Sequence, residues 1–475
     1  MAMDKRALIK NLAAAFAAQG AAFACSVIMS LVVPKLLGVT EYGYYQLFIF
    51  YTSYVSFFAF GLNDGIYLEH GGEDRDSIDK SLILSEFLVG FGIQSVIALV
   101  IAAYAFFGGS EPERQFVLVA VSLFMLISNT TYFFGYVFQS MNETRLFSYG
   151  SMLDRVVFLV PLMVCLIFRI SDFRVYVICF VLARVAALVF SLWNARDFLV
   201  SPLMKAGESM RRAVRSMKIG IVLTVANVSF MLIMGFARSL VDTLWGIEAF
   251  GKLSFSLSLV NFAVTFISQA SMVLFPALRQ SDGVSLARYY RVLRGGLSSI
   301  LPFSYLLYFP LRIFAGIWLP QYEESLYYLI YLMPICVFSV QNNVLYCTYY
   351  KVRNEPWKLL WVNVRALGIS AAGVCFAAFF IGDVIAVVVF AVCGIASCLV
   401  MSDWYLSQQY GCQDVFTVLM SSAVTGGFVA ANALLGFSEA FIATLILLAI
   451  YAALRRRELS DILSRAFGLM RPCRR

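Results

Sequence analysis

The chain contains little charge. Only 13% of its 475 residues are Asp, Glu, Lys or Arg, whereas soluble domains carry about 25%. Hydrophobic residues make up 61%, and the mean hydropathy is +0.82. This composition excludes a soluble globular protein. The apolar residues stand in continuous runs long enough for membrane helices, which need about 20 residues. They do not form the segments of about 10 alternating residues that are typical of a membrane barrel.

Groups that usually carry chemistry are also scarce. The chain has one histidine, His70, and ten cysteines that are scattered singly, without a CxxC pair. This pattern excludes a Cys/His metal centre, and we interpret the cysteines as small apolar packing residues. No phosphate-binding loop, paired catalytic carboxylates or nucleophile elbow is present. We therefore expect no enzyme activity, no ATP use, no cofactor and no nucleic-acid partner.

The apolar runs predict an all-α polytopic membrane protein with fourteen spans and short loops. The predicted spans are residues 8–33, 43–62, 82–107, 116–140, 152–168, 173–193, 219–241, 250–276, 296–319, 325–350, 359–380, 384–402, 414–435 and 437–453. With the N-terminus inside, inside segments hold 26 Lys and Arg residues and outside loops hold four, Lys35, Arg114, Arg169 and Arg174. This asymmetry predicts a multi-pass membrane protein with both termini in the cytoplasm.

An internal repeat indicates two similar halves. The segment Gly38-Val39-Thr40-Glu41-Tyr42-Gly43 returns 208 positions later as Gly246-Ile247-Glu248-Ala249-Phe250-Gly251. Each copy stands at the turn between the first and second helix of a half, so we interpret both as structural hinges. Two related halves in a membrane protein favour transport by alternating access. The predicted domains are two six-helix lobes, 1–195 and 219–407, a basic linker 196–218, two extra helices within 408–453 and a basic tail 454–475.

Three polar segments lie outside the spans. The linker and the tail each combine basic residues with an apolar stripe at helical spacing, which is typical of a helix on the inner membrane surface. Both anionic-lipid binding and a simple topology anchor fit this pattern. Residues 63–80 form an acidic loop, which we interpret either as a solvated turn or as a gate contact with a basic loop of the other half.

Charged residues inside the spans are the candidate functional residues, because membrane charge is costly and usually faces a cavity or a partner. The cations are Arg184, Arg238, Arg365, Arg312 and Arg155. They outnumber the acids, so the sequence predicts a cationic cavity for an anionic substrate, since guanidinium groups match phosphate oxygens. Helix pairing or snorkelling is the alternative for each arginine. The other candidates, which line the cavity or take part in coupling, are Glu86, Asp154, Gln19, Asn227, Asn261, Gln269 and Asn342.

The segments Pro34–Gly43, Gly61–Gly65, Gln139–Asn142, Trp245–Gly251 and Phe275–Arg279 resemble the polysaccharide transporter family. These are the Wzx-type oligosaccharide flippases of the multidrug/oligosaccharidyl-lipid/polysaccharide exporter (MOP) superfamily. The resemblance covers most of residues 5–360. It implies a MATE-like fold and a lipid-linked oligosaccharide as substrate, carried on undecaprenyl pyrophosphate for surface polysaccharides such as O-antigen or capsule. It also implies anion binding by Arg184, Arg238 and Arg365, and membrane lipids, a polysaccharide polymerase and chain-length machinery as further partners.

Several alternatives remain open at this stage. One is a multidrug/cation antiporter of the same superfamily, which would need cavity acids that the first span lacks. Another is a flippase for the peptidoglycan lipid precursor. A third is a membrane glycan polymerase, although the external loops are short. Coupling to H⁺, to Na⁺ or to the membrane potential is expected, because each negative charge that moves outward gains about 2.3 kcal/mol per 100 mV.

Overall fold

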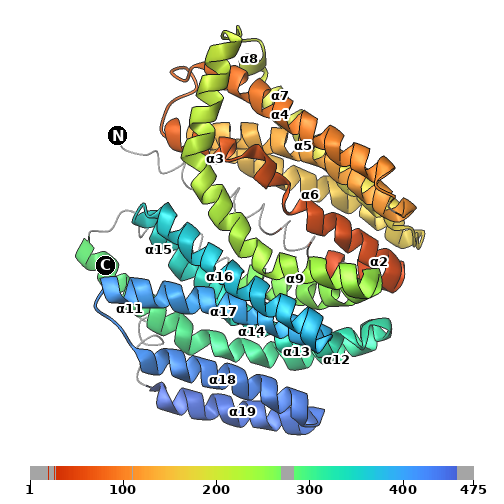
Figure 1. Cartoon of the computed structure of the whole chain (residues 1–475), viewed down its shortest axis with the longest axis vertical. Helices are drawn as coiled ribbons and strands as arrows, with labels where there is room; N and C mark the ends of the chain where they lie inside the picture. The colour runs from red at the N-terminus through yellow and green to blue at the C-terminus, as the bar shows by residue number, and fades with distance from the viewer. Residues whose placement is uncertain (1–19, 21–25, 27, 110, 269–282, 457–475) are drawn as a thin grey trace, which may run out of the picture. The chain divides into compact units, whose positions relative to one another are not determined.

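The computed structural model describes residues 20, 26, 28–109, 111–268 and 283–456 (Figure 1). Within these residues the chain is helical and contains no strand. It forms two compact units. The first comprises the residues up to Val228 together with Trp245–Gly251, and the second comprises Ser229–Leu244 and the residues from Lys252 onward. The lobe boundary predicted at 219 therefore lies inside the first unit, and the predicted domain scheme stays a prediction.

The first unit contains the helices α2 to α8 and the beginning of α9. Their bounds are α2 Val33–Thr52, η1 Val55–Ala59, α3 Leu62–Glu69, α4 Lys80–Phe107, α5 Pro112–Ser140, α6 Thr144–Ile167, α7 Phe173–Asn194, α8 Arg196–Leu199 and α9 Ala206–Ser268. Asp79 caps α4 by accepting a hydrogen bond from the Leu82 N–H, and Asp172 caps α7 at Arg174 in the same way. Such caps satisfy backbone donors that the first turn leaves free.

The second unit contains the α9 residues Ser229–Leu244 and those from Lys252 onward, and the helices that follow. Their bounds are α11 Gly283–Ile300, η2 Leu301–Leu307, α12 Tyr308–Trp318, η3 Pro320–Tyr322, α13 Ser325–Leu332, α14 Pro334–Gln341, the π-helix η4 Asn342–Tyr346, α15 Cys347–Val352, α16 Pro356–Phe376, the π-helix η5 Ala377–Ile381, α17 Val384–Gln409, α18 Val415–Leu434 and α19 Phe437–Leu454.

Ten helices of the described residues are long and apolar enough to cross a membrane, or up to twelve if each of two bent pairs is one span. One of the ten, Ala206–Thr265, covers two predicted spans, and the bent pairs supply the second and the tenth. Every predicted span from the second to the fourteenth therefore has a helical counterpart. The first, 8–33, lies almost wholly outside the described residues, as does most of the basic tail.

Two expectations about helix limits differ from the structure. The fifth span begins at Thr144, eight residues before the predicted start, because the polar residues around Arg145 still form helix. The basic linker is not a separate surface helix, since α9 runs from Ala206 through the predicted seventh span without a break until Gly246. At the starts of α6 and α9, polar residues lower the local hydropathy, although the backbone is already helical.

The sequence repeat has a structural counterpart in the backbone. Gly38 interrupts α2 at φ 73°, ψ 178°, and Gly246 interrupts α9 at φ 81°, ψ −179°. This region of backbone conformation is open essentially to glycine alone. Residues 208 positions apart thus break their helices in the same way, which supports a common origin for the two hairpins.

The two copies of the repeat also pack against each other, within the first unit. A Cβ added to Gly43 would lie 2.6 Å from the Ile247 oxygen, and one added to Gly251 would lie 3.0 Å from the Val39 oxygen. Val39 and Ile247 occupy equivalent positions in the two copies, so the contact is reciprocal. Thr40 Oγ1 donates a hydrogen bond to Glu248 Oε1 at 2.8 Å, joining another equivalent pair. We call this contact the glycine joint.

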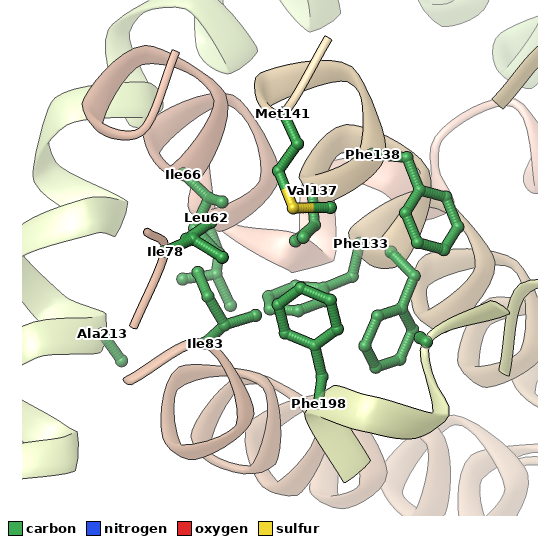
Figure 2. Packing of buried hydrophobic residues seen from close by; sticks show 12 residues of the cluster. Leu62, Ile66, Ile78, Ile83, Phe133, Val137, Phe138, Met141, Phe198 and Ala213 are labelled. Atoms are coloured by element: carbon green, nitrogen blue, oxygen red, sulfur yellow. The ribbon is translucent and has the colours of Figure 1, made fainter. Parts of the chain in front are cut away.

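A buried hydrophobic cluster fixes α3, α4 and the start of α9 to one another (Figure 2). Figure 2 shows Leu62 and Ile66 from α3, Ile83 from α4 and Ala213 from α9 around the aromatic rings of α5 and Phe198 of α8. Their side chains are almost fully buried. One helical turn beyond Ile66, Ile83 and Ala213 stand Glu69, Glu86 and Ser216, so the same packing brings these three polar side chains together.

Gly43→Ala is expected to lower the thermal unfolding midpoint of the purified protein, because the new methyl group would meet the Ile247 backbone oxygen. Overpacking of this kind costs about 1–3 kcal/mol. Gly92→Ala in α4 is the matched control, since nothing lies within 4 Å of a Cβ there and alanine favours helix by about 0.5–1 kcal/mol. Thermal unfolding in detergent measures both variants. A midpoint for Gly43→Ala at or above that of Gly92→Ala would contradict the glycine joint.

Candidate functional site

Arg184 of α7 is held by three helices inside the first unit. Its side chain is buried at 6% exposure, and Nη1 donates to Asp154 Oδ2 of α6 at 2.6 Å. Nε and Nη2 both donate to Ser128 Oγ of α5, at 3.2 and 3.1 Å. The guanidinium carbon lies 4.3 Å from the ring centroid of Tyr132, one turn along α5. Helix pairing, one of the two interpretations of this residue, therefore describes the contacts of Arg184.

Three predicted residues meet at this place. Asp154 also lies 3.8 Å from the half-exposed Arg155, so one carboxylate stands between two guanidinium groups. An anionic ligand at Arg184 would have to compete with Asp154 for the same donors. The substrate-binding role of Arg184 and Arg155 stays a prediction. In the structure, the Asp154 carboxylate would compete with an anionic substrate for these two arginines.

Glu86 forms a second cluster in the first unit. It lies in the second turn of α4 and is 1% exposed. The hydroxyl of Ser216 on α9 lies 3.1 Å from both of its carboxyl oxygens and also 3.1 Å from Glu69 Oε2 of α3. Glu69 is paired with Arg215 at 3.0 Å. Within the described part of the chain, Glu86 forms no ion pair.

The Glu86 cluster has too few protons for all of its close oxygen contacts to be hydrogen bonds if both carboxyl groups are ionised. A serine hydroxyl carries one proton and can donate to only one acceptor at a time. Two ionised carboxylates around one hydroxyl would leave one of them facing an oxygen lone pair, and the like charges would repel. If one carboxyl is protonated, it can donate to Ser216 while Ser216 donates to the other. Glu69 has Arg215 as a counter-charge, so Glu86 is the group that the geometry favours for the proton.

Close backbone contacts surround the Glu86 cluster. A Cβ on Gly65 would lie 1.9 Å from the Ser216 oxygen, and one on Gly220 would lie 2.0 Å from the Gly61 oxygen. Thr224 donates to Asp64 Oδ2 at 2.7 Å. The acidic loop and α3 therefore bind the linker and α9 directly. These contacts lie within the first unit, and both interpretations of the acidic loop stay predictions.

The remaining predicted arginines lie in the second unit with separate surroundings. Arg238 donates from Nη2 to Ser254 Oγ at 2.8 Å. Arg312 donates from Nη1 to the Tyr308 hydroxyl at 2.9 Å, and Arg365 is exposed on α16. These two hydrogen bonds are with different partners, and the cationic cavity stays a prediction.

The predicted polar residues are distributed unevenly. Asn342 is 1% exposed, at the start of the π-helix η4, and its Nδ2 lies 3.6 Å from Cys347 Sγ. Asn227 and Asn261 are exposed on α9. Gln19 and Gln269 lie outside the described residues. A local widening of a helix such as η4 often occurs at functional sites, which makes Asn342 the most distinctive of this group.

Sequence reasoning missed a buried ion pair in the second unit. Arg294 of α11 donates from Nε and Nη2 to the two carboxyl oxygens of Asp403 on α17, at 2.6 and 2.7 Å, and Tyr346 donates to the same carboxylate at 3.0 Å. The predicted ninth span begins at residue 296, two residues after Arg294, whereas α11 begins at Gly283 and buries this side chain. In the sequence, Asp403 was the residue that could have indicated this ion pair, because it is an acid at the end of an apolar helix.

The described residues contain no group of three or more His, Cys, Asp or Glu side chains that could hold a metal ion.

Removal of one partner from the Arg184–Asp154 pair is expected to destabilise the first unit. A buried pair broken on one side costs about 3–5 kcal/mol because the remaining charge stays buried. Arg184→Gln should therefore lower the thermal unfolding midpoint strongly, and the double variant with Asp154→Asn should recover part of the loss. A double-mutant cycle on purified protein measures the coupling. Strictly additive effects would refute the pairing.

Comparison with known proteins gives a family and a fold. A model of a family described as "Polysaccharide biosynthesis protein" matches residues 8–281, which is more than half of the chain. No curated protein matches the chain significantly. Among solved structures, an inward-closed lipid II flippase MurJ aligns with 12% identity and a TM-score of 0.62, covering 95% of this chain and 99% of its own.

Multidrug transporters have the same fold. An inward-facing multidrug resistance MATE family transporter of the MOP superfamily aligns with 9% identity and a TM-score of 0.61, over 81% of this chain and 94% of its own. A mutant of the Vibrio cholerae MATE transporter VcmN aligns with 14% identity and a TM-score of 0.55, over 87% of this chain and 98% of its own. Identities this low establish the fold alone. The chain is a multi-pass membrane protein with the fold of the MOP superfamily, and it belongs to the polysaccharide biosynthesis protein family.

Proposed function

We propose that the protein is a flippase that moves lipid-linked oligosaccharides from the inner to the outer leaflet of the bacterial cytoplasmic membrane. The observation that carries this proposal is the match to a polysaccharide biosynthesis family over residues 8–281, on a fold that it shares with a lipid II flippase. We propose an oligosaccharide repeat unit on undecaprenyl pyrophosphate as the substrate.

The physics of such a substrate suits a helical carrier. Each buried methylene group contributes about 0.8 kcal/mol to membrane binding, so a polyprenyl tail stays in the bilayer throughout. Only the pyrophosphate and the sugars need a polar route. With the inside negative, each negative charge gains about 2.3 kcal/mol per 100 mV on moving outward. The costly step is then the return of the empty carrier, which a coupling ion would assist.

Arg238 and Arg365 are the residues that we propose for the anionic head group. Arg365 is exposed on α16, and Arg238 bonds a serine hydroxyl that could exchange for a phosphate oxygen. Arg184 ranks below Arg365 because Asp154 already neutralises its charge.

We propose a proton as the coupling ion, held at Glu86. The charged and titratable groups that face it are Glu69, His70 and Arg212, besides the Ser216 hydroxyl. Loss of the proton would leave two carboxylates around one hydroxyl and weaken the attachment of α9 to α3 and α4. Proton binding would restore this attachment. The protonation state of Glu86 would thus select between two arrangements of α9.

The flippase proposal is tested in proteoliposomes that contain the purified full chain and an undecaprenyl pyrophosphate-linked glycan. Outward movement is followed by the access of an impermeant glycan-cleaving enzyme. Wild type should expose the glycan at least tenfold faster than empty liposomes. Arg238→Gln and Arg365→Gln should each slow the process at least tenfold. A wild-type rate no higher than that of empty liposomes would refute the function, and normal transport by Arg184→Ala, Arg238→Ala and Arg365→Ala would refute the cationic cavity.

Coupling is tested with Glu86→Gln, whose amide can donate to Ser216 as a protonated carboxyl would. The variant should unfold at a temperature no lower than wild type, while its transport rate becomes independent of an imposed proton gradient. Asp76→Asn, at an exposed acid of the acidic loop, is the control and should keep the gradient dependence. A gradient response in Glu86→Gln equal to that of wild type would exclude Glu86 as the coupling group.

A further inference from the structure

The second unit contains a pocket of about 590 Å³ that the proposed transport cycle does not use. It lies where the turn between α12 and α13 meets the turn between α18 and α19. Its polar lining comes from Arg312, Glu323 and Asn432, and its apolar lining includes Ile313, Ile317 and Phe437. The positive-inside pattern predicts both turns on the outer side of the membrane.

Arg312 is a cation with spare hydrogen-bond donors. It donates one hydrogen bond to the Tyr308 hydroxyl, and its guanidinium carbon lies 5.8 Å from the Tyr308 ring centroid and 5.3 Å from that of Phe437. Among the described residues it forms no ion pair. A guanidinium group has five N–H donors in a fork that matches phosphate oxygens. The two rings hold this fork at the pocket wall.

The first turn of α19 presents backbone N–H groups at the same wall, together with the carboxylate of Glu439. Gly436 and Phe437 both line the pocket, and α19 continues for 18 residues to Leu454. Glycine has no side chain to cap the first turn, although Glu439 Oε2 accepts the Gly436 N–H at 3.3 Å. The free N–H groups of a first helical turn and the helix dipole favour an anion. Arg312 and this helix end therefore act on the same ligand group.

Asn432 indicates that the ligand also carries a hydroxyl. Its side chain is 5% exposed, and Nδ2 donates to the Phe428 oxygen at 2.9 Å. Because a carbonyl oxygen can only accept, this bond fixes the orientation of the amide. Oδ1 has no hydrogen-bond partner, and an unpaired buried acceptor costs about 1–3 kcal/mol. A hydroxyl that enters the pocket wall would remove this cost, and Glu323 offers a second acceptor at the rim.

The mouth of the pocket is apolar. Ile313 and Ile317 are 51% and 79% exposed, and they lie one turn apart on α12. Tyr327 of α13 is 60% exposed beside them. Such a strip suits a hydrocarbon chain that leaves the pocket along the helix surface. The combined lining therefore matches a molecule with a phosphate, a free hydroxyl and an aliphatic chain.

We propose that this pocket is a binding site for the head group of an anionic, hydroxyl-bearing phospholipid of the membrane, such as phosphatidylglycerol. Arg312 and the start of α19 bind the phosphate, and Asn432 and Glu323 accept hydrogen bonds from the glycerol. This inference does not rest on the proposed flippase function. A lipid-linked glycan has the same chemistry, so the test has to separate the two sources.

The test is native mass spectrometry of the full chain, purified in detergent and titrated with phosphatidylglycerol or phosphatidylcholine. Wild type should retain one phosphatidylglycerol at least tenfold more tightly than phosphatidylcholine, and Arg312→Gln should lose this preference. Arg169→Gln, an exposed arginine that the sequence also predicts on the outer side, is the matched control and should behave as wild type. Arg312→Lys keeps the positive charge but loses the paired N–H donors of the guanidinium group, so it should bind phosphatidylglycerol at an intermediate level. It replaces Arg312→Gln in the test if that variant does not fold.

Two results would overturn the site: no retained phosphatidylglycerol in wild type, or equal retention by Arg312→Gln. Addition of an undecaprenyl pyrophosphate-linked glycan then separates the sources. If phosphatidylglycerol stays bound, the phospholipid site is supported. If the glycan lipid displaces it, the phospholipid assignment is wrong and the pocket belongs to the transported lipid. None of these measurements requires transport, so a failure of the flippase assay would leave their result unaffected.

Discussion

Charges within apolar helices must find their partners inside the protein, and this constraint shapes both units. An apolar environment offers no water to solvate them. Arg184 therefore has Asp154, Ser128 and the Tyr132 ring, and Arg294 has both oxygens of Asp403. In each case side chains from several helices converge on one ion pair. These pairs determine which helix faces lie inward, and they leave few charges available for a substrate.

Exceptions to this pairing are the places where function is expected. Glu86 is buried without an ion pair among the described residues, and Arg312 has aromatic rings in place of an acid. A buried acid without a cation can exist cheaply only when it is neutral. A cation between rings keeps its hydrogen-bond donors for another molecule. The two exceptions differ in kind: the first suits exchange of a proton, and the second suits retention of an anionic group.

The number and order of helices could be predicted from the sequence because hydropathy acts locally. The repeat was also visible, since the Gly38 conformation needs glycine at a fixed place. Pairings between distant helices were not accessible from one sequence. Nothing near Glu86 in the chain points to Ser216, which lies 130 positions away. Arg294 fell two residues outside the predicted ninth span because polar neighbours lowered the local hydropathy, although the helix begins earlier. Sequence reasoning therefore found most of the charged residues and could not assign their partners.

The continuity of α9 has a mechanical consequence. About 30 residues separate Ser216 from Gly246, which at about 1.5 Å per residue makes a rod of about 45 Å. The first unit holds this rod near both ends, at the Glu86 cluster and at the glycine joint, while the stretch between them, Ser229–Leu244, belongs to the second unit. If the contacts of the Glu86 cluster separate, the glycine joint still holds the far end of α9. A small displacement caused by one proton near Ser216 would then become a rotation of the whole rod about its far end.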